Sequence, residues 1–131
     1  MHLRQRIKIF VISLIATLAI FRIFLFIFPS INLNVGKYNI HHLFVGALLL
    51  ILVLLLFIFN VFNRFTIISA GFSSALVLDQ IVYLVATDGS DKSYLTKVSL
   101  FGMVILTSVI LILTIILYSL NKQKSIRWKI Y

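Results

Sequence analysis

The sequence predicts an all-α polytopic membrane protein with four transmembrane helices and both termini in the cytoplasm. Of its 131 residues, 62% are hydrophobic and only 11% are charged, whereas a soluble domain carries about 25% charge. Four apolar runs are each long enough to cross a hydrocarbon core, which takes about 20 residues. Short polar segments separate these runs, and no linker or repeat divides the chain. We therefore expect a single membrane domain over residues 1–131.

The first apolar run predicts a helix over about 9–28. It follows the basic residues Arg4, Arg6 and Lys8 and stops at Pro29, which does not fit inside a regular helix. Its apolar core is longer than the roughly 7–15 residues of a secretory signal, and no A-x-A cleavage site follows it. We expect an uncleaved first spanning helix.

The second and third runs predict helices over about 40–62 and 65–86. Only the minimal turn Asn63-Arg64 lies between them, so we expect a tight antiparallel hairpin. The third helix carries two small-xxx-small pairs, Ala70/Ser74 and Gly71/Ala75. In lipid such pairs let helix backbones approach closely, so we expect this helix to be central. The fourth run predicts a helix over about 98–120 that carries no charge.

The distribution of basic residues predicts the orientation in the membrane. Four helices place both termini on one side, and that side collects eight Lys and Arg residues against three in the opposite loops. The positive-inside rule assigns the richer side to the cytoplasm of a plasma-membrane protein, so the loops at 30–39 and 87–97 face outward. Because the basic residues flank apolar runs and form no patch interleaved with aromatics, we expect no nucleic-acid partner.

Two charged residues inside the spans predict an intramembrane ion pair. Arg22 lies about 9 Å below the outer end of the first helix, and Asp79 lies about 10 Å below that of the third. An unpaired charge at such depth costs at least about 3 kcal/mol, so each residue is the expected partner of the other. Gln80 and Tyr83 flank Asp79 and complete this second tier. The pair could fix helix packing or handle protons.

A second group of polar residues is expected at the outer face. It consists of His41, His42, Asp88 and Asp91, with Tyr94 one turn further along the chain. Imidazole and carboxylate ligands suit a divalent cation such as Zn²⁺ or Mn²⁺, so these four residues are candidate metal ligands. A solvated turn around Asp88, with histidines at the membrane interface, is the alternative interpretation.

The expected depths separate this outer group from Asp79. Because His42 leans outward and Asp79 leans inward, we expect about 7 Å or more between their levels. Asp79 and Tyr94 are the candidate catalytic residues. Gly46, one turn below His42, is expected to leave room for another helix or a substrate chain.

Two motifs resemble a family of small prokaryotic integral membrane proteins that are frequent in archaea. The motifs are HHLFVG, which begins at His41, and LVLDQIVYLVATDGSDKSYLTKVSLFG, which begins at Leu76. In that family an HH-x-x-x-G helix start recurs, as does a later helix containing Asp-Glu and followed by an acidic loop with a Tyr. Here Gln80 stands where the family usually has Glu. The resemblance implies the fold and no particular activity.

The predicted function is an outward-facing His/Asp site that binds a metal ion or acts on a lipid or lipid-linked substrate. One alternative is a small homo-oligomeric transporter or channel lined by Arg22, Asp79, Gln80 and Tyr83. Another is an accessory subunit of a membrane complex. The lipid bilayer is the other expected partner of the chain. No Cys and no Walker, HExxH, GxSxG or Rossmann pattern is present, which excludes the sites that depend on them.

Overall fold

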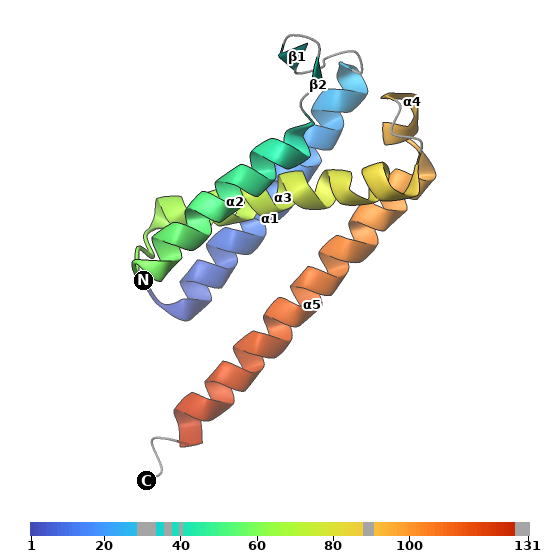
Figure 1. The fold of residues 1–131 in the computed structure, drawn as a ribbon. Coiled ribbons are helices and arrows are strands. Elements are labelled where there is room, and N and C mark those ends of the chain that lie inside the picture. Colours follow the sequence, from blue (N-terminus) through green and yellow to red (C-terminus); the bar gives the residue numbers. More distant parts are fainter. Residues whose placement is uncertain (29–33, 36–37, 40, 88–90, 128–131) are drawn as a thin grey trace.

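The computed structural model is all-α, with four helices of 17 or more residues in the predicted order (Figure 1). These are α1 (Leu3–Ile27), α2 (His42–Ile58), α3 (Arg64–Ala86) and α5 (Lys97–Arg127). The antiparallel strands β1 (Asn34–Val35) and β2 (Tyr38–Asn39) follow α1, and the one-turn helix α4 (Asp91–Tyr94) follows α3. The structure describes residues 1–28, 34–35, 38–39, 41–87 and 91–127, with backbone alone in the two strands and at 91–92 and 123–127. The helices α1, α3 and α5 are long and apolar enough to cross a membrane, and α2 is a shorter apolar helix.

The hairpin of α2 and α3 is antiparallel as predicted, but its connection is longer than a two-residue turn. The second helix was expected to reach residue 62, whereas α2 ends at Ile58. Asn60 has a φ of 59°, in the left-handed region that asparagine tolerates but a helix excludes. The next helix, α3, begins after Asn63. The Oδ1 atom of Asn63 accepts a hydrogen bond from the Thr66 N–H at 2.9 Å. This N-cap satisfies one of the free donors at the start of α3.

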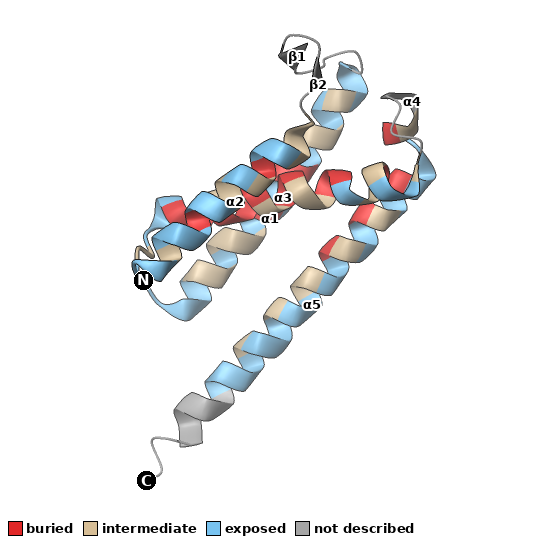
Figure 2. Ribbon diagram, in the orientation of Figure 1, coloured by how far each residue is buried: buried red, intermediate tan, exposed pale blue. Residues whose placement is uncertain are grey.

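The helix α3 is central, as its small residues predicted. It packs against α1, α2 and α5 (Figure 1), and many of the buried residues lie along it (Figure 2). At Gly71 a Cβ atom would lie 2.6 Å from the carbonyl oxygen of Phe10 on α1. Ser13 on α1 donates a hydrogen bond to the carbonyl oxygen of Ile68 at 2.8 Å. The two backbones therefore touch where the small-residue face lies.

Of the two occupants expected beside Gly46, another helix or a substrate chain, the structure shows the helix. A Cβ atom there would lie 2.7 Å from Cβ of Leu76 and 3.0 Å from the carbonyl oxygen of Ser73. The space beside Gly46 is therefore filled by α3. The absence of a side chain at Gly46 lets α2 and α3 cross closely. This contact fixes the position of α2 along the axis of α3.

Replacing Gly71 with valine is expected to lower the free energy of unfolding by about 1–3 kcal/mol, the usual cost of overpacking. The new side chain would meet backbone atoms of α1, which cannot rotate away as a flexible side chain can. Thermal unfolding in detergent measures the effect. Ala86→Val, at an exposed position on the same helix, is the matched control and should change stability little. Equal stability of the two variants would contradict this contact.

The two ends of the helix bundle hold different groups of side chains. The N-terminus and the C-terminal part of α5 lie away from the β1–β2 hairpin and α4 (Figure 1). At the terminal end, the Arg6 guanidinium lies 4.8 Å from the centre of the Phe62 ring, which joins α1 to the α2–α3 connection. At the other end, Nη1 of Arg22 donates to the Tyr94 carbonyl oxygen at 3.1 Å. Arg22, His42, Asp79 and Tyr94, all singled out in the sequence, lie together at this second end.

Candidate functional site

The candidate site is built around the carboxylate of Asp79, which is 1% exposed. Its Oδ1 accepts from Nε of Arg22 at 2.5 Å, which confirms the predicted ion pair. Its Oδ2 accepts from Nε2 of His42 at 2.9 Å and from the Tyr94 hydroxyl. The three donors come from α1, α2 and α4. Asp79 on the central helix α3 therefore holds three other elements through one side chain.

Arg22 extends the network to the fifth helix. One Nη atom donates to the Tyr94 carbonyl oxygen at 3.1 Å. The other donates to the Asp79 carbonyl oxygen at 3.2 Å and to Oγ of Ser99 on α5 at 3.1 Å. The guanidinium also lies 4.4 Å from the centre of the Tyr94 ring. With its donors this widely engaged, Arg22 positions the carboxylate and leaves little capacity for an external ligand.

His42 lies much closer to Asp79 than the sequence predicted. The expected separation of about 7 Å or more between their levels is wrong, because the two side chains share a hydrogen bond. The prediction placed the outer ends of the second and third helices at one level. In the structure Oε1 of Gln80 accepts from the Leu43 N–H at 2.9 Å, so α2 begins beside Gln80, six residues before α3 ends at Ala86. This register brings His42 down to Asp79.

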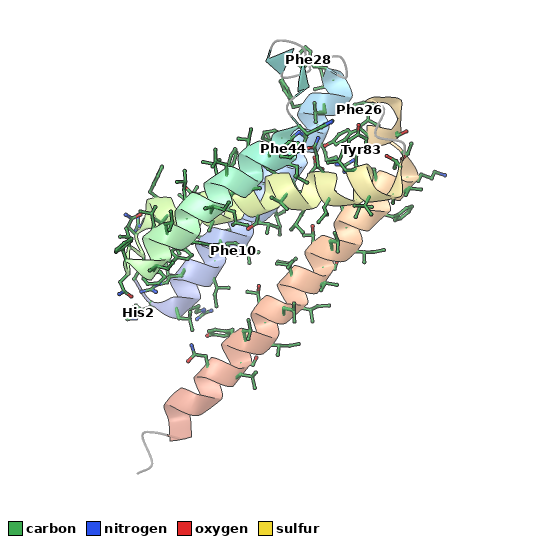
Figure 3. The ribbon with its side chains drawn as sticks, in the orientation of Figure 1. His2, Phe10, Phe26, Phe28, Phe44 and Tyr83 are labelled. Carbon is green, nitrogen blue, oxygen red and sulfur yellow. The ribbon has the colours of Figure 1, made fainter. Side chains whose placement is uncertain are left out.

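Tyr94 is also deeper than predicted. It was assigned to the wet outer group, but it is 7% exposed and packs among Tyr83, His42 and Arg22. Figure 3 labels Tyr83 near the end of α3, where α4 approaches it. The chain after α3 folds back through α4 and returns the Tyr94 ring to the helix bundle. Burial, together with the negative charge of Asp79, raises the pKa of the Tyr94 hydroxyl, which stays a neutral donor.

This raised pKa predicts an alkaline effect on both titration and stability. An unfolded chain loses tyrosine protons near about pH 10, but folded Tyr94 keeps its proton above that pH. Tyr94 therefore stabilises the fold below about pH 10, and the stabilisation is lost as the pH rises further. Ultraviolet titration of the five tyrosines should show a late fraction that Tyr94→Phe lowers by one tyrosine. A late fraction of unchanged size in Tyr94→Phe would contradict the assignment.

The second ring nitrogen of His42 is open to a ligand. Because ionised Asp79 can only accept, Nε2 of His42 is the donor and, in the neutral ring, Nδ1 is an acceptor. Within the described part of the chain Nδ1 has no hydrogen-bond partner, although every buried side-chain nitrogen or oxygen there has one. Nδ1 therefore lies at the accessible edge of a side chain that is 20% exposed. The pair has the form of a carboxylate-oriented imidazole base.

The predicted metal ligands are not brought together within the described residues. His42 directs Nε2 to Asp79, and His41 lies with its ring 6.2 Å from that of Tyr83. Asp88 and the side chain of Asp91 lie outside the described residues. Across residues 1–28, 41–87 and 93–122, no three His, Cys, Asp or Glu side chains converge as metal ligands. The metal site accordingly stays a prediction.

One residue of the site had no role in the sequence interpretation. Ser99 on α5 is fully buried and accepts from Arg22. Gln80 was expected to add hydrogen bonding beside the ion pair, and its described bond goes to the start of α2. The signal available in the sequence was Arg22 itself, since a buried guanidinium needs more acceptors than one carboxylate supplies.

The helices and the buried charges together indicate a multi-pass helical membrane protein with Asp79 paired to Arg22 and His42. The chemistry that this arrangement offers is proton transfer through Nδ1 of His42, with Asp79 holding the ring and Arg22 holding the carboxylate. Comparison with known proteins adds no relative, because no protein-family model, curated protein or solved structure matches the chain.

Proposed function

We propose that the chain is a plasma-membrane protein whose His42–Asp79 pair acts as a general base and acid on a lipid or lipid-linked substrate. In this proposal α2 crosses the membrane with the three longer helices, and both termini lie in the cytoplasm. The excess of basic residues on the terminal side supports that orientation. At 17 residues, α2 has the minimum length of a spanning helix.

The observation that carries the proposal is the hydrogen bond from Nε2 of His42 to Asp79, which leaves Nδ1 accessible. A buried carboxylate fixes the orientation and the tautomer of the ring, as in other acid–base pairs. Nδ1 can then remove the proton of a water or hydroxyl oxygen while that oxygen attacks an ester carbonyl or a phosphoryl group. The same nitrogen returns the proton to the leaving oxygen. The new bond to the attacking oxygen replaces the bond to the leaving oxygen, and the proton moves from the first oxygen to the second through Nδ1.

The surroundings of His42 favour a substrate that arrives from the bilayer. The Phe21 ring lies 5.5 Å from the His42 ring, centre to centre. Phe44, two residues along α2, is 60% exposed (Figure 3). A polar group that reaches Nδ1 past such side chains is best carried on an apolar chain. A lipid or a lipid-linked molecule has that character.

The test is a search for conversion in reconstituted membranes. Purified protein is placed in vesicles made from a total membrane lipid extract, in water enriched in ¹⁸O, and the lipids are followed by mass spectrometry. We expect either label in a hydrolysed species or a headgroup moved from one lipid to another, and neither in protein-free vesicles. Lipid patterns identical with and without the protein would contradict the proposal.

The metal interpretation is kept as a variant of this proposal. Its ligands would be His41, Asp88 and Asp91, since the described bond of His42 goes to Asp79. A metal-bound water would then supply the attacking oxygen. Metal analysis of the purified protein tests it, with a stoichiometric ion expected in the wild type and lost in His41→Ala/Asp91→Ala. A metal-free wild-type protein would contradict it.

A second candidate function is ion or proton transport, favoured by the continuous polar network inside the spans. The network joins Arg22, Asp79 and Ser99 across α1, α3 and α5. Flux assays in liposomes distinguish the two functions, because transport should cease in Asp79→Asn while lipid composition stays constant. Unchanged flux in that variant would contradict a pathway through Asp79.

A further inference from the structure

The end of the helix bundle that carries the N-terminus is rich in cations and poor in anions. We call it the basic end and define it by Arg4, Arg6, Lys8 and Arg64. All three acidic residues of the chain lie within 79–91, and Asp79 lies toward the other end. The ion pairs among the described residues both involve Asp79. Among the described residues, no carboxylate side chain pairs with the cations of the basic end.

The packing of α1 on α3 brings Arg6 and Arg64 to the same end of the bundle. The two helices run in the same direction, and the hydrogen bond from Ser13 to Ile68 fixes their register. Arg64, one turn before Ile68, therefore lies level with residue 9 of α1. Arg64 also shares a face with Gly71, seven residues on, which touches α1. Arg6 lies over the Phe62 ring, two residues before Arg64.

The donors of these two guanidinium groups are largely unused. Nε of Arg6 donates to the Met1 carbonyl oxygen at 3.1 Å. In the described part of the chain, the terminal N–H groups of Arg6 and all those of Arg64 have no hydrogen-bond partner. Both residues stand at the start of a helix with no acidic residue in its first turn, where the helix dipole favours an anion.

We propose that the basic end binds the phosphate of an anionic phospholipid between Arg6 and Arg64. Guanidinium groups bind phosphate through paired N–H donors, and here two such groups lie at one end of the bundle with no ion pair to a described carboxylate. Both residues lie at the end of a membrane-spanning helix, at the depth of lipid headgroups. Phe65, beside Arg64, is 73% exposed and offers a surface for the acyl chain. This site is independent of the His42–Asp79 proposal.

The experiment measures retention of phosphatidylglycerol by native mass spectrometry of detergent-released protein, with phosphatidylcholine as the neutral comparison. The wild type should retain phosphatidylglycerol preferentially. Arg6→Gln/Arg64→Gln should weaken that binding about 30-fold, the effect of losing two basic residues near a headgroup. Lys97→Gln/Lys122→Gln removes the same charge from exposed positions on α5 and should retain the lipid.

Three outcomes would overturn the proposal: equal loss in the control variant, equal retention of phosphatidylcholine, or displacement of the lipid by inorganic phosphate at millimolar concentration. The last result would identify free phosphate as the ligand. If the double variant does not fold, Arg64→Gln carries the test, since its guanidinium makes no hydrogen bond to the described residues. About fivefold weaker binding supports the site, and unchanged binding overturns it.

Discussion

Replacing Asp79 with leucine is expected to lower the free energy of unfolding by about 3–5 kcal/mol, the usual cost of removing one partner from a buried ion pair. The loss is large because Arg22 keeps its charge at 11% exposure and no longer has the carboxylate. His42 and Tyr94 lose the same acceptor, so α2 and α4 are released together. Reversible unfolding in mixed detergent measures the difference.

The control for this prediction is the double variant Arg22→Leu/Asp79→Leu. It removes both charges and should be more stable than Asp79→Leu, since a matched apolar pair often replaces a buried ion pair at little cost. Arg22→Leu alone should be milder than Asp79→Leu, because Asp79 still accepts from His42 and Tyr94. Additive effects of the two single substitutions would contradict the coupling that the structure shows.

His42→Gln is expected to slow the reaction at the proposed site by about 10²- to 10⁴-fold, the usual contribution of a general base. Glutamine keeps a hydrogen bond to Asp79 within reach but offers no nitrogen that can take up a proton. The rate of lipid conversion in vesicles measures the effect, and unfolding of the same variant should change far less than that of Asp79→Leu.

For a site that works without a metal ion, His41→Gln is the matched control, because the neighbouring histidine has no hydrogen bond to Asp79 among the described residues. Its ring lies 6.2 Å from that of Tyr83, so we expect activity close to that of the wild type. A comparable loss in both variants would show that the acid–base role does not belong to His42 alone. Full activity in His42→Gln would exclude that role.

The parts of the fold that depend on run length and charge could be predicted from the sequence. Four apolar runs gave the four long helices, and the small residues around Gly71 gave the central position of α3. The Arg22–Asp79 pair followed from the high cost of an unpaired charge at depth. None of these required knowledge of how one helix is shifted along another.

The parts of the site that depend on helix register could not be predicted. His42 reaches Asp79 only because α2 begins beside Gln80 and crosses α3 closely at Gly46. One residue of helix shift moves a side chain by about 1.5 Å along the axis, so a small error in the helix ends separates true partners. Tyr94 was misplaced for a related reason, since polar composition after α3 gave no sign that α4 turns back onto the bundle.

The most direct measurement of the central claim is the tautomer of His42 in the folded protein. The chain has only three histidines, so ¹⁵N-histidine NMR in lipid vesicles gives few signals, and His42→Gln identifies the one that matters. With His42 neutral, the structure predicts a proton on Nε2 and none on Nδ1, in a signal that Asp79→Asn alters. A His42 signal with the proton on Nδ1, or one indifferent to Asp79→Asn, would contradict the claim that Asp79 orients this ring.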